Sequence, residues 1–311
     1  MSSRQLKTIF AVLTVLVLAY ATVRLLSGDD RRSGGDDIVA AVQDGFSLVR
    51  ALGPGAEDSV RLEEVDGSWT VNGYPADTSL IRQLTDGLDT AHVGRLVARS
   101  ATNHARLGIE DDLAWRIEIG PPGDPDITFL LGGGGTDGRY ARFPPSDEVF
   151  AVPVASVYLL GRSVEEWRSR IVASVDTSVV NRIAVHRNDE AASVLLARVI
   201  GDSAARWSLE GATVDTAVVD ALLRESANLT ATGFPSDSVT FAVDFDSPSA
   251  LLEMFDSDEP GAVPALSLLL LTAPDARDFL VRRADDPLVY RISSPQAERL
   301  VPTRAMLLPE E

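Results

Sequence analysis

The chain has 311 residues, which suits two domains of ordinary size, and 45% of these residues are hydrophobic. Its 28 basic and 46 acidic residues give a net charge of −18, and this acidic excess argues against nucleic-acid binding, which needs basic side chains to neutralise phosphates. Because the sequence contains no cysteine, disulfides, thiol catalysis and thiolate metal sites are excluded.

A long apolar run near the N-terminus predicts a membrane anchor. Arg4 and Lys7 precede the run, and Ile9–Leu26 is about long enough for one crossing of the lipid bilayer. Basic residues ahead of the run place the N-terminus in the cytoplasm, so the rest of the chain is expected outside it. A secretory signal cleaved after Ala21 is the alternative. The run continues past that point through Arg24 and two leucines, which favours a retained anchor.

Composition divides the remainder into a linker and two α+β domains. We assign residues 1–26 to the transmembrane anchor, 27–44 to a polar, glycine-rich linker, 45–175 to the first domain and 176–311 to the second. Apolar residues in Ile38–Leu52 have a mixed spacing that is compatible with a short helix.

The two domains are predicted from an internal repeat. The sequence Trp-Thr-Val-Asn-Gly at residues 69–73 matches Trp-Ser-Leu-Glu-Gly at residues 207–211, which lies 138 positions later. Asp77-Thr78 and Asp215-Thr216 match in the same frame. The Trp-x-hydrophobic step predicts a strand, the glycine a turn and the aspartate a helix N-cap. Each copy is therefore predicted as strand, turn and capped helix, with its tryptophan in the core.

The similarity continues into short alternating segments that follow each helix. These segments predict antiparallel meander strands at Ile127–Leu131, Arg139–Phe143 and Val149–Val152 in the first copy, and at Leu266–Leu271, Phe279–Arg283 and Leu288–Ile292 in the second. The predicted fold class is thus α+β, with two tandem copies of one unit behind an N-terminal transmembrane helix. The predicted helices span Asp77–Leu88 and Asp215–Ser226.

A run of four glycines, residues 132–135, is the first candidate for chemistry because glycine-rich loops can hold phosphates. A phosphate-binding loop of the Walker type needs a lysine and a serine or threonine that open a helix after the glycines. Here residues 136–140, which follow the glycines, are predicted to resume a strand, so the glycines are interpreted as a flexible hairpin turn.

The titratable residues form no recognisable catalytic or metal-binding pattern. His92, His104 and His186 lack the spacing of metal ligands. Acidic stretches at residues 244–246 and 256–259 could hold calcium, but they lack an EF-hand pattern and are better interpreted as solvated loops. We therefore assign no catalytic, cofactor-binding or metal-binding residue, and we expect no cofactor.

Several short motifs together resemble a bacterial family called domain of unknown function 4340. The motifs are Gly67-Ser68-Trp69-Thr70-Val71, Pro75-Ala76-Asp77, His92-Val93-Gly94-Arg95-Leu96-Val97, Leu107-Gly108-Ile109, Leu131-Gly132, Arg139-Tyr140-Ala141-Arg142 and Val149-Phe150-Ala151-Val152. The resemblance implies a single-anchored extracytoplasmic protein of the bacterial inner membrane, often associated with gliding-motility-type ABC transporters. It supplies no catalytic residues.

Two functional hypotheses follow, from different classes. The first is a non-enzymatic accessory or scaffold subunit of an integral membrane complex, held in the bilayer by residues 9–26. The second is an extracytoplasmic module that binds a small ligand or glycan in a cleft between the two repeats.

Overall fold

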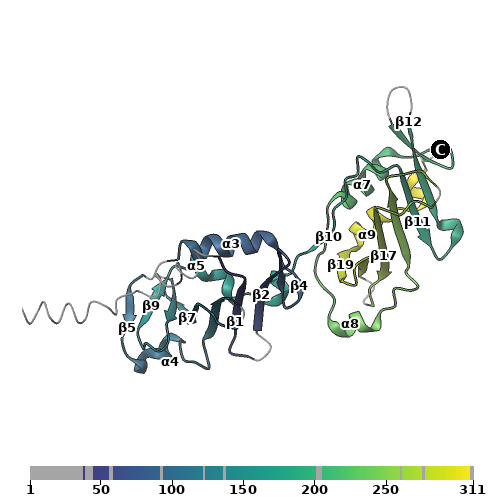
Figure 1. Cartoon of the computed structure of the whole chain (residues 1–311). Helices are drawn as coiled ribbons and strands as arrows, with labels where there is room; N and C mark the ends of the chain where they lie inside the picture. The colour runs from purple at the N-terminus through teal and green to yellow at the C-terminus, as the bar shows by residue number, and fades with distance from the viewer. Residues whose placement is uncertain are drawn as a thin grey trace, which may run out of the picture. The chain divides into compact units, whose positions relative to one another are not determined.

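A computed structural model describes residues 38, 45–55, 59–91, 94–121, 123–135, 138–200, 205–259, 261–274 and 277–308 of the chain. The chain separates into two compact units, Met1–Ser169 and Arg170–Glu311, here called the N-terminal and C-terminal units (Figure 1). The predicted anchor lies outside the described residues. Within the described part of the chain, no helix is long and apolar enough to cross a membrane.

The N-terminal unit is built on one antiparallel sheet of nine strands. In sheet order the strands are β4 (Tyr74–Pro75), β3 (Ser68–Val71), β2 (Ser59–Val65), β1 (Leu48–Leu52), β6 (Trp115–Gly120), β7 (Ile127–Gly135), β8 (Gly138–Arg142), β9 (Val149–Val152) and β5 (Leu96–Ala98). Most neighbours in the sheet are also neighbours in the sequence. This local pairing is typical of a meander.

Helices cover the two faces of this sheet unequally. They are α3 (Thr78–Asp89), η1 (Ala101–Asn103), α4 (His104–Leu107), α5 (Val154–Val157), η2 (Tyr158–Gly161) and α6 (Val164–Trp167). The helix α3 buries Ile81, Leu84 and Leu88 in the main core, to which β7 contributes Phe129 and Leu131. Figure 1 shows α3 and α5 along one side of the strands and α4 on the other. A smaller cluster on the α4 side packs against only part of the sheet.

The C-terminal unit is built on an eight-stranded antiparallel sheet. Its strands, in sheet order, are β14 (Ala212–Thr213), β13 (Ala205–Leu209), β12 (Val194–Ile200), β11 (Arg182–Arg187), β16 (Ala250–Phe255), β17 (Leu266–Thr272), β18 (Asp278–Arg283) and β19 (Val289–Ser293). A separate pair joins β10 (Ile171–Ala173) to β15 (Leu229–Thr230). The helical elements are α7 (Thr216–Ala227), η3 (Glu190–Ala192), α8 (Asp237–Ala242), α9 (Ser294–Leu300) and α10 (Arg304–Leu307).

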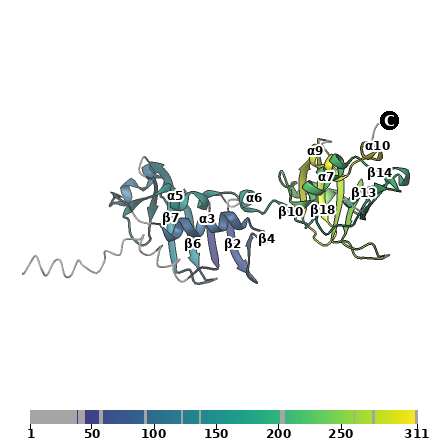
Figure 2. The ribbon, with the colours of Figure 1, turned by 90° about the horizontal axis from the view of Figure 1, so that it is seen from above.

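The C-terminal unit also has a main core on one sheet face and a smaller cluster on the other. The helix α7 buries Val219 and Leu222 in the main core, together with β16 and β17 side chains such as Leu252 and Leu268. The smaller cluster combines Phe245, which follows α8, with side chains from β17 to β19. Figure 2 shows α7 and α9 against the strands of this unit. Both units are therefore α+β, as the sequence predicted.

Two-residue turns fix how the first strands of each sheet pair. Asn72 and Gly73 join β3 to β4 with φ values of 49° and 86°, and Glu210 and Gly211 join β13 to β14 with 53° and 89°. Positive φ at both central residues is the signature of a type I′ turn, whose twist matches that of the flanking strands. The predicted turns are thus present at both glycines.

Three expectations need correction. Residues 48–52 form the central strand β1, which pairs with β2 and β6, and not part of a helix, because the alternation of an extended strand buries Val49 and Ala51 in the main core and places Arg50 on the opposite face. Glycines 132–135 extend β7 and do not form the hairpin turn, because the end of α4 approaches this backbone closely. Trp69 and Trp207 pack against the cores but are only partly buried, whereas Trp167 is 1% exposed.

The predicted helix caps are confirmed. The Asp77 carboxylate accepts hydrogen bonds from the Ser79 N–H at 2.8 Å and the Ser79 hydroxyl at 2.6 Å, and Asp215 accepts one from the Ala217 N–H at 2.8 Å. Burial of Asp77 would raise its pKa, but the bonds from Ser79 and Leu80 outweigh this effect and lower the pKa.

Asp77→Ala should lower the free energy of unfolding of the N-terminal unit by about 1 kcal/mol near pH 7, the usual contribution of an N-cap. Since the folded-state pKa is lowered, the cap stabilises fully above the pKa of the unfolded aspartate. The difference from wild type should therefore shrink as the pH falls below roughly 4. Urea unfolding at several pH values measures this. Asp86→Ala, which removes an exposed charge from the same helix, is the control. An equal loss for both variants would contradict the capping role.

Gly132→Ala should destabilise the N-terminal unit by roughly 1–3 kcal/mol or more, because the added Cβ would overlap the Gly108 carbonyl. Gly134→Ala is the matched control, since its Cβ would meet its nearest atom, the Gly138 oxygen, at an ordinary 3.5 Å. Thermal unfolding of both variants measures the difference. Equal effects would show that the close approach at Gly132 does not constrain the residue there.

Candidate functional site

The histidines considered as metal ligands lie apart. His104 is buried, and its Nε2 lies 2.9 Å from the Asp147 carbonyl oxygen in the N-terminal unit. His186 is exposed in the C-terminal unit, with Nε2 3.0 Å from Glu253 Oε2. His92 lies outside the described residues. Each described histidine thus has a local structural partner.

The acidic stretches form local turns. Asp244 Oδ1 accepts a hydrogen bond from the Asp246 N–H at 2.9 Å, and Ser257 Oγ accepts one from the Glu259 N–H at 3.2 Å. Among the residues that the structure describes, no three His, Asp or Glu side chains are grouped so that they could hold a metal ion.

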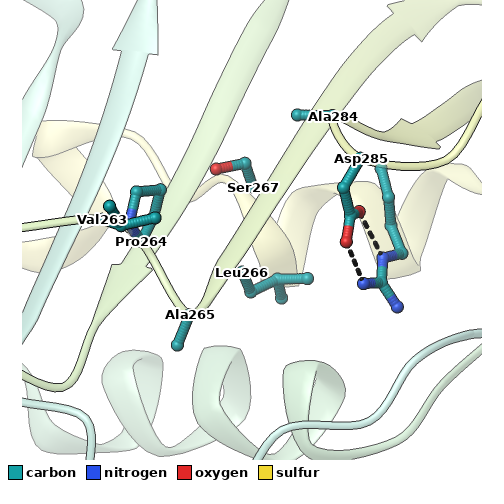
Figure 3. A pocket seen from close by; sticks show the side chains of 8 residues that line it. Val263, Pro264, Ala265, Leu266, Ser267, Ala284 and Asp285 are labelled. Carbon is teal, nitrogen blue, oxygen red and sulfur yellow. Dashed lines mark hydrogen bonds and ion pairs between the residues drawn. The ribbon is translucent and has the colours of Figure 1, made fainter.

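One pocket, of about 360 Å³, lies in the C-terminal unit where β17 begins and β18 ends (Figure 3). It is lined by Val263, Pro264, Ala265, Leu266, Ser267, Arg283, Ala284 and Asp285. Arg283 donates two hydrogen bonds to Asp285, of 2.9 and 2.5 Å. This bonding raises the pKa of Arg283 and lowers the pKa of Asp285. Because the two charges satisfy each other, the pocket offers a ligand mainly aliphatic surface.

A second pocket, of about 370 Å³, lies in the N-terminal unit and is lined by Val60, Trp115, Gly161, Ser163, Val164, Glu165 and Glu166. Its polar side belongs largely to the capping box of α6, in which the Glu166 carboxylate accepts from the N–H and the hydroxyl of Ser163 at 3.0 Å each. The bonds from Ser163 lower the pKa of Glu166. The Glu166 carboxylate is therefore already engaged in capping the N-terminus of α6.

The sheet faces opposite the main cores give the clearest contrast between the units. In each sheet, the smaller cluster covers the later strands of this face, and the earlier strands turn their alternate side chains to solvent. We call these two surfaces the open faces. The N-terminal open face consists of Arg50, Arg61, Glu63, Val65, Arg116 and Glu118, and the C-terminal open face of Arg182, Ala184, His186, Leu195, Ala197, Val199, Arg206 and Glu253.

Ion pairs link the charged side chains of the N-terminal open face. Arg61 binds Glu63 through two contacts of 3.0 and 2.7 Å. Glu118 accepts from Arg50 at 3.2 Å and from Arg116 at 3.0 Å. A face whose charges are matched in this way is well solvated and offers a partner little reason to bind.

The C-terminal open face is apolar along β12. Leu195 and Val199 are each 52% exposed, and Ala197 lies between them. The neighbouring strands contribute Arg182, whose guanidinium lies 4.1 Å from the centroid of the Phe255 ring, and the exposed Arg206.

The pairing registers allow the two open faces to be compared position by position. β2 pairs with β3, which carries Trp69, and β12 pairs with β13, which carries Trp207. The residues just before the turns at Gly73 and Gly211 are Val71 and Leu209, and they pair with Leu62 and Leu196. Counting one residue back and one forward from these pairs, Arg61 corresponds to Leu195, and Glu63 corresponds to Ala197.

The next strand follows the same pattern. Arg50 lies opposite Arg61, and Ala184 lies opposite Leu195. On the far side, Arg50 pairs with Glu118 and Ala184 pairs with Glu253. Three charged positions of the N-terminal open face are thus leucine or alanine in the C-terminal one. Glu118 is paired with Arg50, whereas the corresponding Glu253 is paired with Ala184. Glu253 is bonded to His186 instead.

The sequence contained a signal for this surface that its interpretation missed. β12 reads Val-Leu-Leu-Ala-Arg-Val-Ile, so both of its faces are mostly apolar, whereas β2 reads Ser-Val-Arg-Leu-Glu-Glu-Val and alternates between polar and apolar residues as far as Glu63. A strand that is apolar on both faces is usually buried on both, and an exposed apolar face is a common mark of an interaction site.

Comparison with known proteins identifies the family. A sequence model described as Domain of unknown function (DUF4340) matches residues 69–248, which is more than half of the chain and includes parts of both units. No curated protein and no solved structure shows significant similarity to it. The chain therefore belongs to the DUF4340 family.

Proposed function

We propose that this protein is a non-enzymatic accessory subunit of an integral membrane complex. A single N-terminal helix would hold it in the bacterial inner membrane, with its body outside the cytoplasm. The observation that carries the proposal is the C-terminal open face, where Leu195 is 52% exposed at the position that the ion-paired Arg61 holds in the other unit. An exposed apolar surface of this kind favours a protein-binding role.

The anchor gives this role its location. Ile9–Leu26 supplies the length for one bilayer crossing, and the basic residues before it favour an external body. The gliding-motility-type ABC transporter suggested by the family resemblance is the kind of complex that such a subunit would join.

We also propose that the two units arose as tandem copies of one unit. Three features support this: the matching strand order from β4 to β9 and from β14 to β19, the type I′ turns at Gly73 and Gly211, and the caps at Asp77 and Asp215. Duplication would leave one copy free to change its open face while the other kept a solvated one.

The native protein should partition with membranes and resist extraction by high salt, and its N-terminal sequence should begin at Met1 or Ser2. Leu16→Arg, which places a charge in the middle of the apolar run, should move much of it to the soluble fraction, because a central arginine opposes insertion. Met306→Arg, which adds the same charge at an exposed position outside the apolar run, is the control and should leave the chain with the membranes. A soluble mature chain that starts at Thr22 would contradict the anchor.

The full chain, extracted in mild detergent, should co-purify with integral membrane proteins in fixed ratio. Quantitative mass spectrometry of the purified sample, with an unrelated single-anchored protein as control, measures this. Purification of the chain alone, after chemical crosslinking in intact membranes, would refute the accessory role.

A further inference from the structure

We propose that the C-terminal open face binds a partner protein through a segment that combines apolar side chains with carboxylates. This inference rests on the proposed accessory function and specifies the partner's surface. It is drawn from the shape and the charge of the face.

The apolar part of the face runs along the strand β12. Leu195, Ala197 and Val199 point to the same side of β12, with about 7 Å between successive side chains. Ala184, which is 5% exposed, lies beside Leu195 on β11. Leu195 and Val199 thus present two exposed aliphatic side chains on either side of Ala197, and these can pack against an aliphatic or aromatic side chain of the partner.

Two arginines determine the charge that the partner needs. Arg182 pairs with Ala197 across β11 and β12, and Arg206 pairs with Val199 across β12 and β13, so one guanidinium lies on each side of the apolar strip. The face also includes His186 and Glu253, which are bonded to each other, so this carboxylate is occupied within the face. Arginine binds carboxylates with fixed, bidentate geometry and is enriched in protein interfaces.

These charges favour an acidic protein over two other occupants. A second copy that docked by the same face would bring the two arginines of one copy near those of the other, which opposes association. An anionic membrane would attract the arginines but would be repelled by the acidic remainder of the chain. Both alternatives give distinct outcomes in the experiment below.

The test uses the full chain in the membranes of its native host, with a photo-crosslinking amino acid in place of Leu195. We expect one discrete adduct with another protein. The crosslinked peptide of that protein should carry Asp or Glu next to apolar residues. The same probe at Arg61, the corresponding position of the N-terminal open face, should give no such adduct. A second control places the probe at Met306, an exposed apolar residue outside the face.

Charge reversal separates recognition from chance proximity. With the probe at Leu195, Arg206→Glu should reduce the adduct roughly five- to tenfold, because an attraction becomes a repulsion. Arg61→Glu makes the same change on the N-terminal open face and should leave the yield unchanged. Arg206 is exposed, so its replacement should be tolerated by the fold, and unchanged circular dichroism and protein level verify this.

Several outcomes would overturn the proposal. These are an adduct of twice the chain's mass, a lipid adduct, a crosslink within the chain itself, an adduct that is insensitive to Arg206→Glu, and the absence of any adduct. If integral membrane proteins still co-purify in such a case, the proposed function stands and only the assignment of the face fails. If they do not co-purify, the accessory function fails as well.

Discussion

The register of the antiparallel ladders is the constraint on which the rest of this structure depends. Successive side chains of a strand point to opposite faces, so a shift of one residue would exchange every core residue of that strand with a solvent-facing one. The two-residue turns at Asn72–Gly73 and Glu210–Gly211 prevent such a shift in the first hairpins. Val71 and Leu209, which immediately precede these turns, are thereby held in the cores. Their pairing partners Leu62 and Leu196 lie in the same cores, and the residues next to these partners lie on the open faces.

This constraint explains why two units of the same strand order can differ in what they offer to a partner. The core positions of β2 and β12 are hydrophobic in both, since each must pack against a capped helix. The outward positions have no such requirement and are free to diverge. In one unit they carry matched ion pairs, and in the other they carry aliphatic side chains between two arginines.

Much of the fold could be predicted from the sequence because its signals are local. Alternation predicted β7, β8 and β9 together with β17, β18 and β19, and the aspartates at 77 and 215 predicted the starts of α3 and α7. The strand β1 escaped prediction because Arg50 is the one polar residue in Leu48–Leu52, which leaves too little alternation to indicate a half-exposed strand. The glycines of β7 were assigned to a turn because the sequence does not reveal the nearby backbone of Gly108.

The candidate site was harder to predict, for a physical reason. Leu195 can be matched to Arg61 only when each strand is aligned through its pairing partner. The spacing between these two residues in the sequence differs from the 138 positions between the two tryptophans. Two residues separate β2 from β3, whereas β12 ends at Ile200 and β13 begins at Ala205. Comparison at the fixed spacing of 138 positions therefore pairs the wrong residues on β2 and β12.

The short outer strands of the two sheets have a further consequence. β4 and β14 contain only two residues each, and β4 ends in Pro75, which has no N–H to donate. A sheet that ends in so little free backbone is a poor template for adding a strand from another molecule. At the edge nearest to β12, addition of a strand is therefore disfavoured. The short strand β14 thus limits one route by which the half-exposed apolar side chains of β12 could promote fibrous aggregation.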